Sequence, residues 1–477
     1  MTSASHAPPR GSRAERAELD LAFDRAAGSR PVPGNTLEHH PDSAGALEEM
    51  LRRIAAAERS IHLENYIIQD DRIGGRFADA LADRARAGVH VRVLYDALGS
   101  FSTSRAYWKR LAQAGVEVRA FHPIVSARLS DVISRDHRKL LLVDGGRAMI
   151  GGLCIGDEWA GDPARGRQPW RDTMLTICGP AAAVLDRAFG RIWARAGPPL
   201  PPGDLAPVAD PCGASTVRVV AGVPEQARIY RVVQLLAAVV AERLWITDAY
   251  LVPPAPLFAS LLDAARGGVD VRVLVPGTSD LPVVRTFTRA WYREMLAAGV
   301  RIFEWRGPML HAKTLVADRA WARVGSSNLN ASMLTNYELD VFAECGGLAD
   351  ALAAQFRRDL ASSREIVLQP RRLRRPALIG APAAPEAPPV SGHRRSRREL
   401  TQVAAVTLGR MAGGLRRTVA GTAALTFTVL GGMLLLFPRV MSVALAAGAF
   451  VLAAGSLLYG LQKRRAREAG DARDDGA

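Results

Sequence analysis

The pattern His-x-Lys-x4-Asp occurs twice in this chain, as HRKLLLVD at 137–144 and HAKTLVAD at 311–318. Six residues separate each aspartate from a run of mostly small residues, GGLC at 151–154 and GSSN at 325–328. Each pattern opens an apolar run of the length and composition that predict a β-strand. One copy of so short a pattern is weak evidence, but two copies with matching downstream turns indicate a repeated structural unit.

Other segments repeat as well, at similar but unequal offsets, which indicates a duplication followed by loop insertions. Apolar runs alternate with helix-like stretches such as 75–87 and 257–266. This alternation predicts an α/β fold with a largely buried sheet. The repeated pairs are SIHLENYII at 60–68 with RLWITDAYLV at 243–252, GVHVRVL at 88–94 with GVDVRVL at 268–274, and WKRLAQAGVEVRAF at 108–121 with YREMLAAGVRIFEW at 292–305.

The chain of 477 residues is long enough for several folded units. A Pro- and Gly-rich stretch at 197–211 separates the two copies. The predicted organisation is an N-terminal extension at 1–45, a first half at 46–200, a second half at 212–368, a basic Pro- and Ala-rich linker at 369–405 and a hairpin of two membrane-spanning helices at 415–463.

The hairpin is predicted from two uncharged apolar runs, 419–437 and 440–461, each near the ~20 residues that cross a bilayer as a helix. Arg416 and Arg417 precede the pair and basic residues at 463–465 follow it, which predicts that both outer ends, and the catalytic part, lie on the cytoplasmic side of the inner membrane. A buried hairpin in a soluble core is the alternative. The linker is expected either to attract acidic lipid or simply to be solvated.

The net charge is +15, from 62 Lys and Arg against 47 Asp and Glu, and it favours an anionic partner such as nucleic acid, acidic lipid or a phosphorylated metabolite. The four cysteines are far apart and show no metal-binding spacing. The N-terminus has no apolar segment typical of a secretory signal. No metal or other cofactor is therefore predicted.

Two histidines at one site provide the groups that phosphodiester chemistry needs. One imidazole attacks phosphorus, and the other donates a proton to the leaving alcohol and then deprotonates the acceptor. Strand alternation places each lysine on the face of its histidine and each aspartate on the opposite face, where it fixes a turn or a neighbouring strand. The predicted assisting groups are Lys139 and Lys313, which neutralise the phosphoryl oxygens, and Ser326 and Asn328, which are neutral donors. Asp172 and Glu338 are predicted to be the carboxylates that hold the imidazoles, and each follows the histidine of its own half in the sequence.

These motifs resemble the paired HKD motifs of the phospholipase D superfamily. The resemblance covers roughly residues 47–368 and is closest to the bacterial cardiolipin synthases. The phrases that carry it are IHLENYI at 61–67, VRVLYDALGS at 91–100, GGLCIGDEW at 151–159, PWRDT at 169–173, GSSNLN at 325–330 and NYELDV at 336–341.

The resemblance implies two duplicated halves that form one pseudo-two-fold active site and a covalent phosphatidyl-histidine. It implies phosphatidyl transfer in which two phosphatidylglycerols give cardiolipin and glycerol. Phosphatidylethanolamine is a further candidate substrate. The resemblance favours His137 as the nucleophile. Gly152 and Cys154 depart from the family pattern, which has Ser or Thr and Asn at these places. The implied catalytic residues are His137, Lys139, Asp144, His311, Lys313 and Asp318.

Two other functions remain open at this point. The first is hydrolysis of a phosphodiester by a phospholipase D, with nucleic acid the less favoured substrate. The second is a catalytically inactive scaffold that binds acidic lipid, against which the intact His and Lys of both motifs argue. Lipid is favoured over nucleic acid because of the predicted membrane hairpin.

Overall fold

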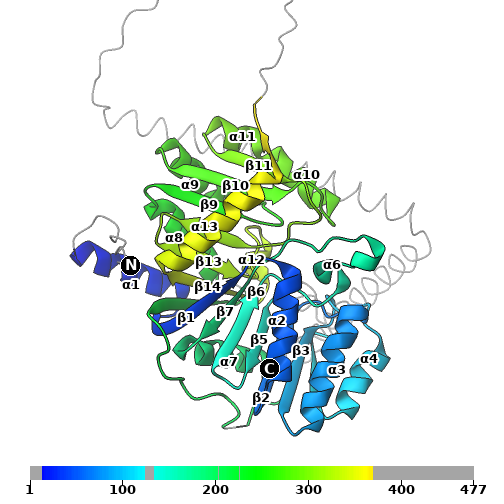
Figure 1. Ribbon diagram of the computed structural model, residues 1–477. Helices are drawn as coiled ribbons and strands as arrows, with labels where there is room; N and C mark the ends of the chain where they lie inside the picture. Colours follow the sequence, from blue (N-terminus) through cyan, green and yellow to red (C-terminus); the bar gives the residue numbers. More distant parts are fainter. Residues whose placement is uncertain (1–12, 124–133, 202, 225, 369–477) are drawn as a thin grey trace, which may run out of the picture. The chain divides into compact units, whose positions relative to one another are not determined.

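The computed structural model shows a first half, coloured blue to cyan, joined to a second half, coloured green to yellow (Figure 1). The linker expected at 369–405 and the hairpin expected at 415–463 lie outside the described residues. Among the helices that are described, none combines the length and apolar character needed to cross a bilayer. The described residues are 13–123, 134–201, 203–224 and 226–368.

The first half alternates strands with helices, as the sequence predicts. Helix α3 begins at Arg72 and ends at Arg86, where the helix-like stretch was expected. The elements in chain order are α1 (Arg13–Ala27), β1 (Val32–His40), α2 (Ser43–Ala55), β2 (Ser60–Asn65), α3 (Arg72–Arg86), β3 (His90–Asp96), α4 (Arg105–Gln113), β4 (Glu117–Phe121), β5 (Lys139–Val143), β6 (Arg147–Gly151), α6 (Asp157–Ala160), β7 (Met174–Cys178) and α7 (Pro180–Trp193).

The second half repeats this succession with small additions. Its elements in chain order are β8 (Ser215–Gly222), α8 (Arg228–Val239), β9 (Arg243–Thr247), α9 (Ala255–Arg266), β10 (Asp270–Pro276), α10 (Pro282–Ala290), α11 (Tyr292–Ala297), β11 (Arg301–Trp305), β12 (Thr314–Ala317), β13 (Trp321–Gly325), α12 (Ser332–Thr335), β14 (Glu338–Glu344), α13 (Gly346–Ala361) and β15 (Ser363–Ile366).

The strand order shows the duplication directly. The described strands follow one another in the order β15-β11-β10-β9-β12-β13-β14-β8-β1-β7-β6-β5-β2-β3-β4. Counted outward from the β1–β8 junction, the two halves have the same order, with β15 as an addition to the second. β1 and β8 pair antiparallel, so the halves meet across a pseudo-two-fold relation. The predicted α/β fold with duplicated halves is confirmed.

The boundary predicted at residue 45 is wrong, because β1 belongs to the folded sheet. Its residues Thr36–His40 pair with β7, while Val32 and Asn35 pair with β8. Between Val32 and Asn35, where the register with β8 shifts, Gly34 has φ +88°, a backbone conformation that glycine adopts easily. The strand reads VPGNTLEHH, and its Pro-Gly pair and polar C-terminal end do not form the pattern of a strand.

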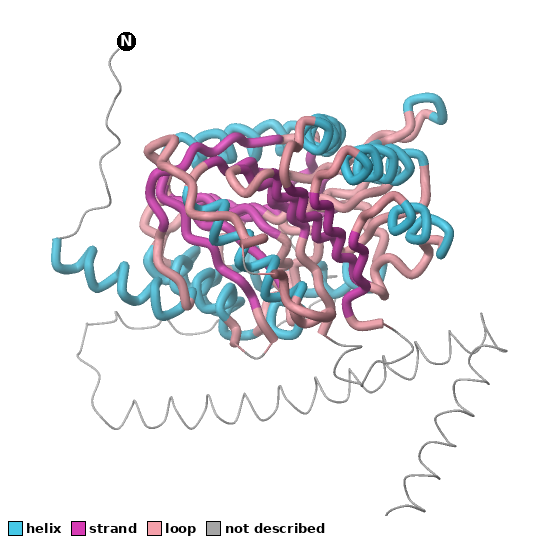
Figure 2. The backbone as a smooth tube through the Cα atoms, turned by 90° about the horizontal axis from the view of Figure 1, so that it is seen from below, coloured by secondary structure: helices cyan, strands magenta, loops and turns pink. Residues whose placement is uncertain are grey.

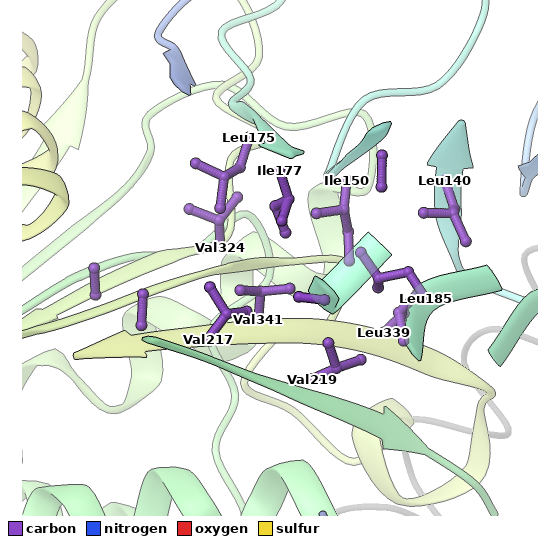
Figure 3. Close-up of a cluster of buried hydrophobic side chains, with 14 of the residues drawn as sticks. Leu140, Ile150, Leu175, Ile177, Leu185, Val217, Val219, Val324, Leu339 and Val341 are labelled. Carbon is purple, nitrogen blue, oxygen red and sulfur yellow. The ribbon is translucent and has the colours of Figure 1, made fainter. Parts of the chain in front are cut away.

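A large apolar core lies between the two halves (Figure 3). In β5 the side chains of Leu140 and Leu142 face this central core, whereas Leu141 and Val143 face an outer core of the first half. A strand buried on both faces explains the uninterrupted apolar run after the motif. Figure 2 shows the strands in the interior with helices on both flanks. Since His137 and Lys139 stand at the start of this buried strand, the core positions the site.

Candidate active site

The backbone places each histidine against the opposite half. The His137 N–H donates to the carbonyl of Tyr337 (2.9 Å), which lies in the second half. In the same way, the His311 N–H donates to the carbonyl of Arg171 (2.8 Å) in the first half, and the Arg171 N–H donates to Met309 (2.9 Å). Both motifs are therefore brought together at the junction, as one site requires.

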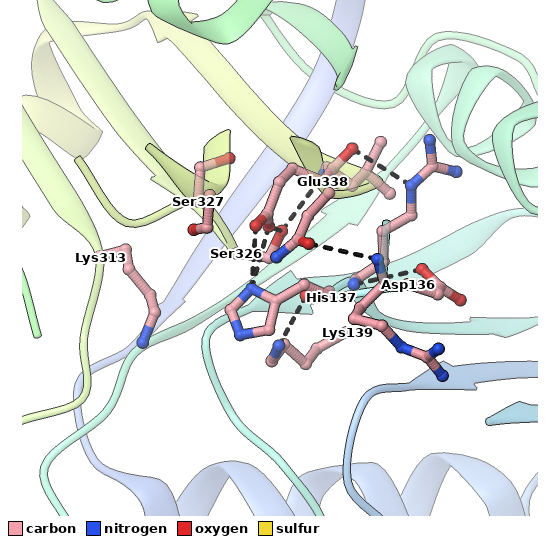
Figure 4. Close-up of polar contacts among 12 residues, drawn as sticks. Asp136, His137, Lys139, Lys313, Ser326, Ser327 and Glu338 are labelled. Atoms are coloured by element: carbon pink, nitrogen blue, oxygen red, sulfur yellow. Dashed lines mark hydrogen bonds and ion pairs between the residues drawn. The ribbon is translucent and has the colours of Figure 1, made fainter. Parts of the chain in front are cut away.

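Each imidazole is held by a carboxylate from the other half. Nδ1 of His137 lies 3.1 Å from both carboxylate oxygens of Glu338, at the start of β14 (Figure 4). Nδ1 of His311 lies 2.7 Å from Oδ2 of Asp172, just before β7. The two carboxylates were predicted, but their pairing with the histidine of their own half was wrong. The pseudo-two-fold junction turns the starts of β7 and β14 toward the opposite motif.

The two motif lysines are fully buried beside their histidines. Nζ of Lys139 donates to the carbonyl of His137 (2.6 Å), and Nζ of Lys313 donates to that of His311. Both side chains are 0% exposed. The two buried ammonium groups beside the two imidazoles supply positive charge for the oxygens of an anion.

Aromatic rings line the same site, a role that no pattern in the sequence predicts. The Tyr66 ring lies 4.9 Å from that of His137 and 5.0 Å from Nζ of Lys139. The Tyr250 ring lies 5.9 Å from His311, and that of Trp159 lies 5.5 Å from it. All three aromatic residues lie in segments that are repeated or that resemble the family, at 60–68, 151–159 and 243–252. These segments indicated the family, but nothing in them indicated that the rings contact the histidines.

Burial sets the protonation of the motif residues. It lowers the pKa of His137 below its ordinary value, and Glu338 opposes this shift only in part. Burial and then the charge of Lys313 lower the pKa of His311, against the opposing effect of Asp172. Burial also lowers the pKa of Lys313 to about 8. Both imidazoles are therefore neutral at pH 7, and a phosphate anion beside them would favour protonation of one.

The two carboxylates stay ionised. Burial alone would raise the pKa of Asp172, but His311 beside it reverses the effect and holds the pKa below its usual range. The pKa of Glu338 is likewise lowered, because His137 outweighs its burial. An ionised carboxylate at Nδ1 favours the tautomer that carries its proton there, which leaves the Nε2 lone pair free to act as nucleophile or base.

The two carboxylates are supported by different donors. The Ser326 hydroxyl donates to Glu338 (2.5 Å), so Ser326 positions this carboxylate. The prediction that Ser326 donates its proton to the phosphate is therefore wrong. At the corresponding place Gly152 leaves room for Asp172, since a Cβ there would lie 2.4 Å from its Oδ1. The Trp159 indole N–H donates to Asp172 instead (3.2 Å). The departure from the family pattern at Gly152 therefore has a steric cause.

Asn328 and Cys154 occupy corresponding places after the two glycines. Both side chains are buried. Within the described residues Oδ1 of Asn328 has no hydrogen-bond partner. Burial raises the pKa of the Cys154 thiol, so the first half supplies a neutral, weakly polar group where the second supplies an amide.

The motif aspartates lie at the far ends of their strands. Asp144 accepts backbone N–H groups of residues 58–60 at 2.7–3.0 Å, and Asp318 accepts those of residues 241–243 at 2.8–3.3 Å. Both take a positive φ, +52° and +50°. Their inclusion among the catalytic residues is therefore corrected: they fix the entry into β2 and β9, as strand alternation indicates.

No group of three or more His, Cys, Asp or Glu residues that could hold a metal ion is found in the described part of the chain. The chemistry available at this site is that of two imidazoles, two ammonium groups and two carboxylates. These groups suit acid–base and nucleophilic transfer at an anionic centre.

Comparison with known proteins agrees with this geometry. The family described as "Cardiolipin synthase, PLD-like domain" matches residues 50–158 and 233–360. Cardiolipin synthase A of Pseudomonas aeruginosa is 37% identical over 334 residues, covering 69% of this chain and 67% of that protein. Cardiolipin synthase of Halalkalibacterium halodurans is 34% identical over 336 residues, covering 68% and 66%. The chain thus spans about two thirds of the length of these relatives.

Among solved structures, the phosphatidylserine synthase of Haemophilus influenzae superposes with a TM-score of 0.57 at 15% identity, covering 73% of this chain and 92% of that one. This likeness concerns the fold. The family match in both halves and the relative that is 37% identical over two thirds of its length show that the chain belongs to the cardiolipin synthase family of phospholipase D-like proteins.

Proposed function

We propose that this protein is a phosphatidyltransferase that converts two phosphatidylglycerols into cardiolipin and glycerol. The observation that carries the proposal is the reciprocal arrangement of the histidines, each buried next to a lysine and held at Nδ1 by a carboxylate of the other half. The family of the chain supplies the substrate class. Phosphatidylethanolamine is the other lipid that we propose to test.

The first step forms the covalent intermediate. Nε2 of one neutral histidine, which the family resemblance favours as His137, attacks the donor phosphorus. The bond from phosphorus to the leaving glycerol oxygen breaks, and protonated His311 gives its proton to that oxygen. Lys139 and Lys313 neutralise the non-bridging oxygens. The side-chain oxygen of Asn328 has no hydrogen-bond partner among the described residues, and a half turn of this amide would exchange it for the NH2 group, a donor suited to a phosphate oxygen.

The second step transfers the phosphatidyl group. The now neutral His311 removes the proton from a glycerol hydroxyl of a second phosphatidylglycerol. The resulting oxygen nucleophile attacks phosphorus, and the phosphorus–nitrogen bond to His137 breaks. Cardiolipin leaves, His137 is again neutral, and His311 carries the proton needed for the next cycle. If water replaced the lipid alcohol, the same steps would give phospholipase D-type hydrolysis to phosphatidic acid.

We further propose that the protein works at the cytoplasmic face of the inner membrane. The support is the sequence of the C-terminal region, where two uncharged runs are flanked by basic residues at both outer ends. The basic linker at 369–405 would add attraction to acidic lipid of about 1 kcal/mol for each Lys or Arg near the surface.

Lipid analysis of a cardiolipin-deficient host expressing the full chain tests the function. We expect cardiolipin with the unsubstituted chain and a loss of at least about 1,000-fold with either His137→Asn or His311→Asn, because both steps need both imidazoles. His90→Asn is the control, since His90 is exposed at the start of β3. Cardiolipin formation in either active-site variant would contradict the shared site, and phosphatidic acid as sole product would establish the hydrolase.

A further inference from the structure

An exposed apolar loop borders the site in the first half. Loop 97–104, between β3 and α4, exposes Leu98 and leaves 75% of Phe101 in contact with solvent. The loop is nevertheless fixed, because the Ser100 hydroxyl donates to the carbonyl of Tyr66 (3.1 Å). A rigid loop that displays a large aromatic side chain is typical of a surface that meets an apolar partner.

The second half exposes apolar side chains at the corresponding place, after β10. Leu281, Val283 and Phe287 are exposed at the start of α10 and along it, with the last two one helical turn apart. The arginines of this helix are tied to the protein: Arg289 forms two hydrogen bonds with the buried Glu304 (2.7 and 3.0 Å), and Arg285 donates to the carbonyl of Gly277 (3.0 Å). Neighbouring exposed apolar side chains on one helix are typical of a face that meets an apolar partner.

Both surfaces are one contact away from a catalytic ring. Tyr66, which anchors the loop, packs its ring 4.9 Å from that of His137. Asp280, just before α10, accepts a hydrogen bond from the hydroxyl of Tyr250 (2.9 Å), whose ring lies 5.9 Å from that of His311. Strands β3 and β10 hold equivalent places in the two halves, and both surfaces follow the carboxyl ends of these strands. Lys139 of the site pairs with Asn65 at the carboxyl end of β2, next to β3. In Figure 1, α4 and α10 lie on the same side of the strands.

We propose that loop 97–104 and the exposed face of α10, together called the rim, insert into the boundary between headgroups and acyl chains of a phospholipid bilayer. This inference rests on the proposed function in one respect: a phosphatidyl donor resides in a bilayer, and a rim inserted on both sides would hold the site over it. Exposed Arg105 and Lys109, one turn apart on α4 directly after the loop, supply positive charge for acidic headgroups. Phe101 and Phe287 are large enough to contribute most of the insertion.

Quenching by brominated lipids tests insertion without reference to catalysis. The full chain carrying Phe101→Trp is reconstituted into phosphatidylglycerol vesicles with brominated acyl chains, and the quenching beyond that of the unsubstituted chain is measured. We expect clear added quenching for Phe101→Trp and Phe287→Trp. The control is Val208→Trp, because Val208 is also exposed (62%) but belongs to a segment away from the site. Two residues before it, Ala206 lies next to Gly145, which follows the end of β5 opposite to Lys139. Equal quenching at the rim and at the control would overturn the proposal.

An activity ratio tests the consequence for catalysis. The double variant Phe101→Ser, Phe287→Ser is compared with the unsubstituted chain on phosphatidylglycerol vesicles and on short-chain phosphatidylglycerol dispersed as monomers. We expect its loss on vesicles to exceed its loss on monomers by about tenfold, because only vesicle substrate requires insertion. Val208→Ser should show no such difference. Equal losses on both substrates would overturn the proposal.

The two proposals fail separately. If the unsubstituted chain transfers no phosphatidyl group from either substrate, the proposed function is wrong, while quenching at the rim still decides insertion. If the rim shows no added quenching and a photo-crosslinker at position 287 joins it to residues 369–477 or to a second copy of the chain, the rim is covered by protein and the bilayer is not its partner.

Discussion

The two halves share one frame, yet they support their chemistry differently. In the second half Ser326 donates to Glu338, which holds His137. In the first half the serine is replaced by Gly152, and an indole donates to the shorter carboxylate of Asp172, which holds His311. Because each carboxylate serves the other half's imidazole, neither half contains a complete catalytic pair. A duplication that exchanges its partners in this way can let the two imidazoles take unequal roles.

The largest effect is expected from breaking the exchanged pairs. Glu338→Gln and Asp172→Asn should each lower kcat/KM for cardiolipin formation by about 100-fold, because each imidazole loses the group that fixes its tautomer and orientation. Asp83→Asn, on the exposed surface of α3, is the control. Activity within a few-fold of the unsubstituted chain would show that the carboxylates only fill space.

Double-mutant cycles on the free energy of unfolding test which pairs are coupled. His137→Asn and Glu338→Gln should show a coupling of about 1 kcal/mol, whereas His137→Asn and Asp172→Asn should be additive within about 0.5 kcal/mol. The reverse result would restore the pairing within each half that sequence order suggests.

The sequence predicted those parts of the structure that are encoded locally. The duplicated α/β halves, both histidines and lysines, and even the two carboxylates could be found from patterns and spacing. The structural place of Asp144 and Asp318 followed from strand alternation, against the motif's usual reading as one catalytic unit. Each of these inferences rests on a short run of neighbouring residues or on the recurrence of such a run elsewhere in the chain.

Other features depend on contacts between distant segments. The exchange of Asp172 and Glu338 is decided by the β1–β8 junction. Strand β1 itself has a Pro-Gly pair and a polar C-terminal end, so its sequence does not predict a strand. The role of Ser326 is decided by Glu338, which lies on the neighbouring strand. No spacing rule specifies which of two equivalent partners a side chain meets across a pseudo-two-fold axis.

A smaller effect is expected from making the halves alike. Gly152→Ser restores the family pattern in the first half but places Cβ about where Asp172 already lies, at 2.4 Å from its Oδ1. We expect a loss of about 1–3 kcal/mol in the free energy of unfolding and of about tenfold in activity, since Asp172 must move away from His311. Gly75→Ser is the matched control, because a Cβ at Gly75 in α3 meets nothing within 4 Å. Unchanged activity in Gly152→Ser would show that Asp172 can move without cost to His311.

The smallest effect concerns the charge of the second-half lysine. The pKa of Lys313 lies at about 8, below its usual value, so the ammonium is fully charged below pH 7 and is lost as the pH rises through 8. Since the charged form neutralises the phosphate, kcat/KM should fall above pH 8 in the unsubstituted chain. Lys313→Arg keeps its charge at every pH, so the alkaline fall should move up by at least about one pH unit. At pH 7 the kcat/KM of Lys313→Arg should be only about threefold lower, because the guanidinium has a different geometry. The control is Lys109→Arg, at an exposed position of α4, which should leave the pH profile of kcat/KM unchanged. A pH profile of Lys313→Arg that matched the unsubstituted chain would assign the alkaline fall to another group and remove this difference between the halves.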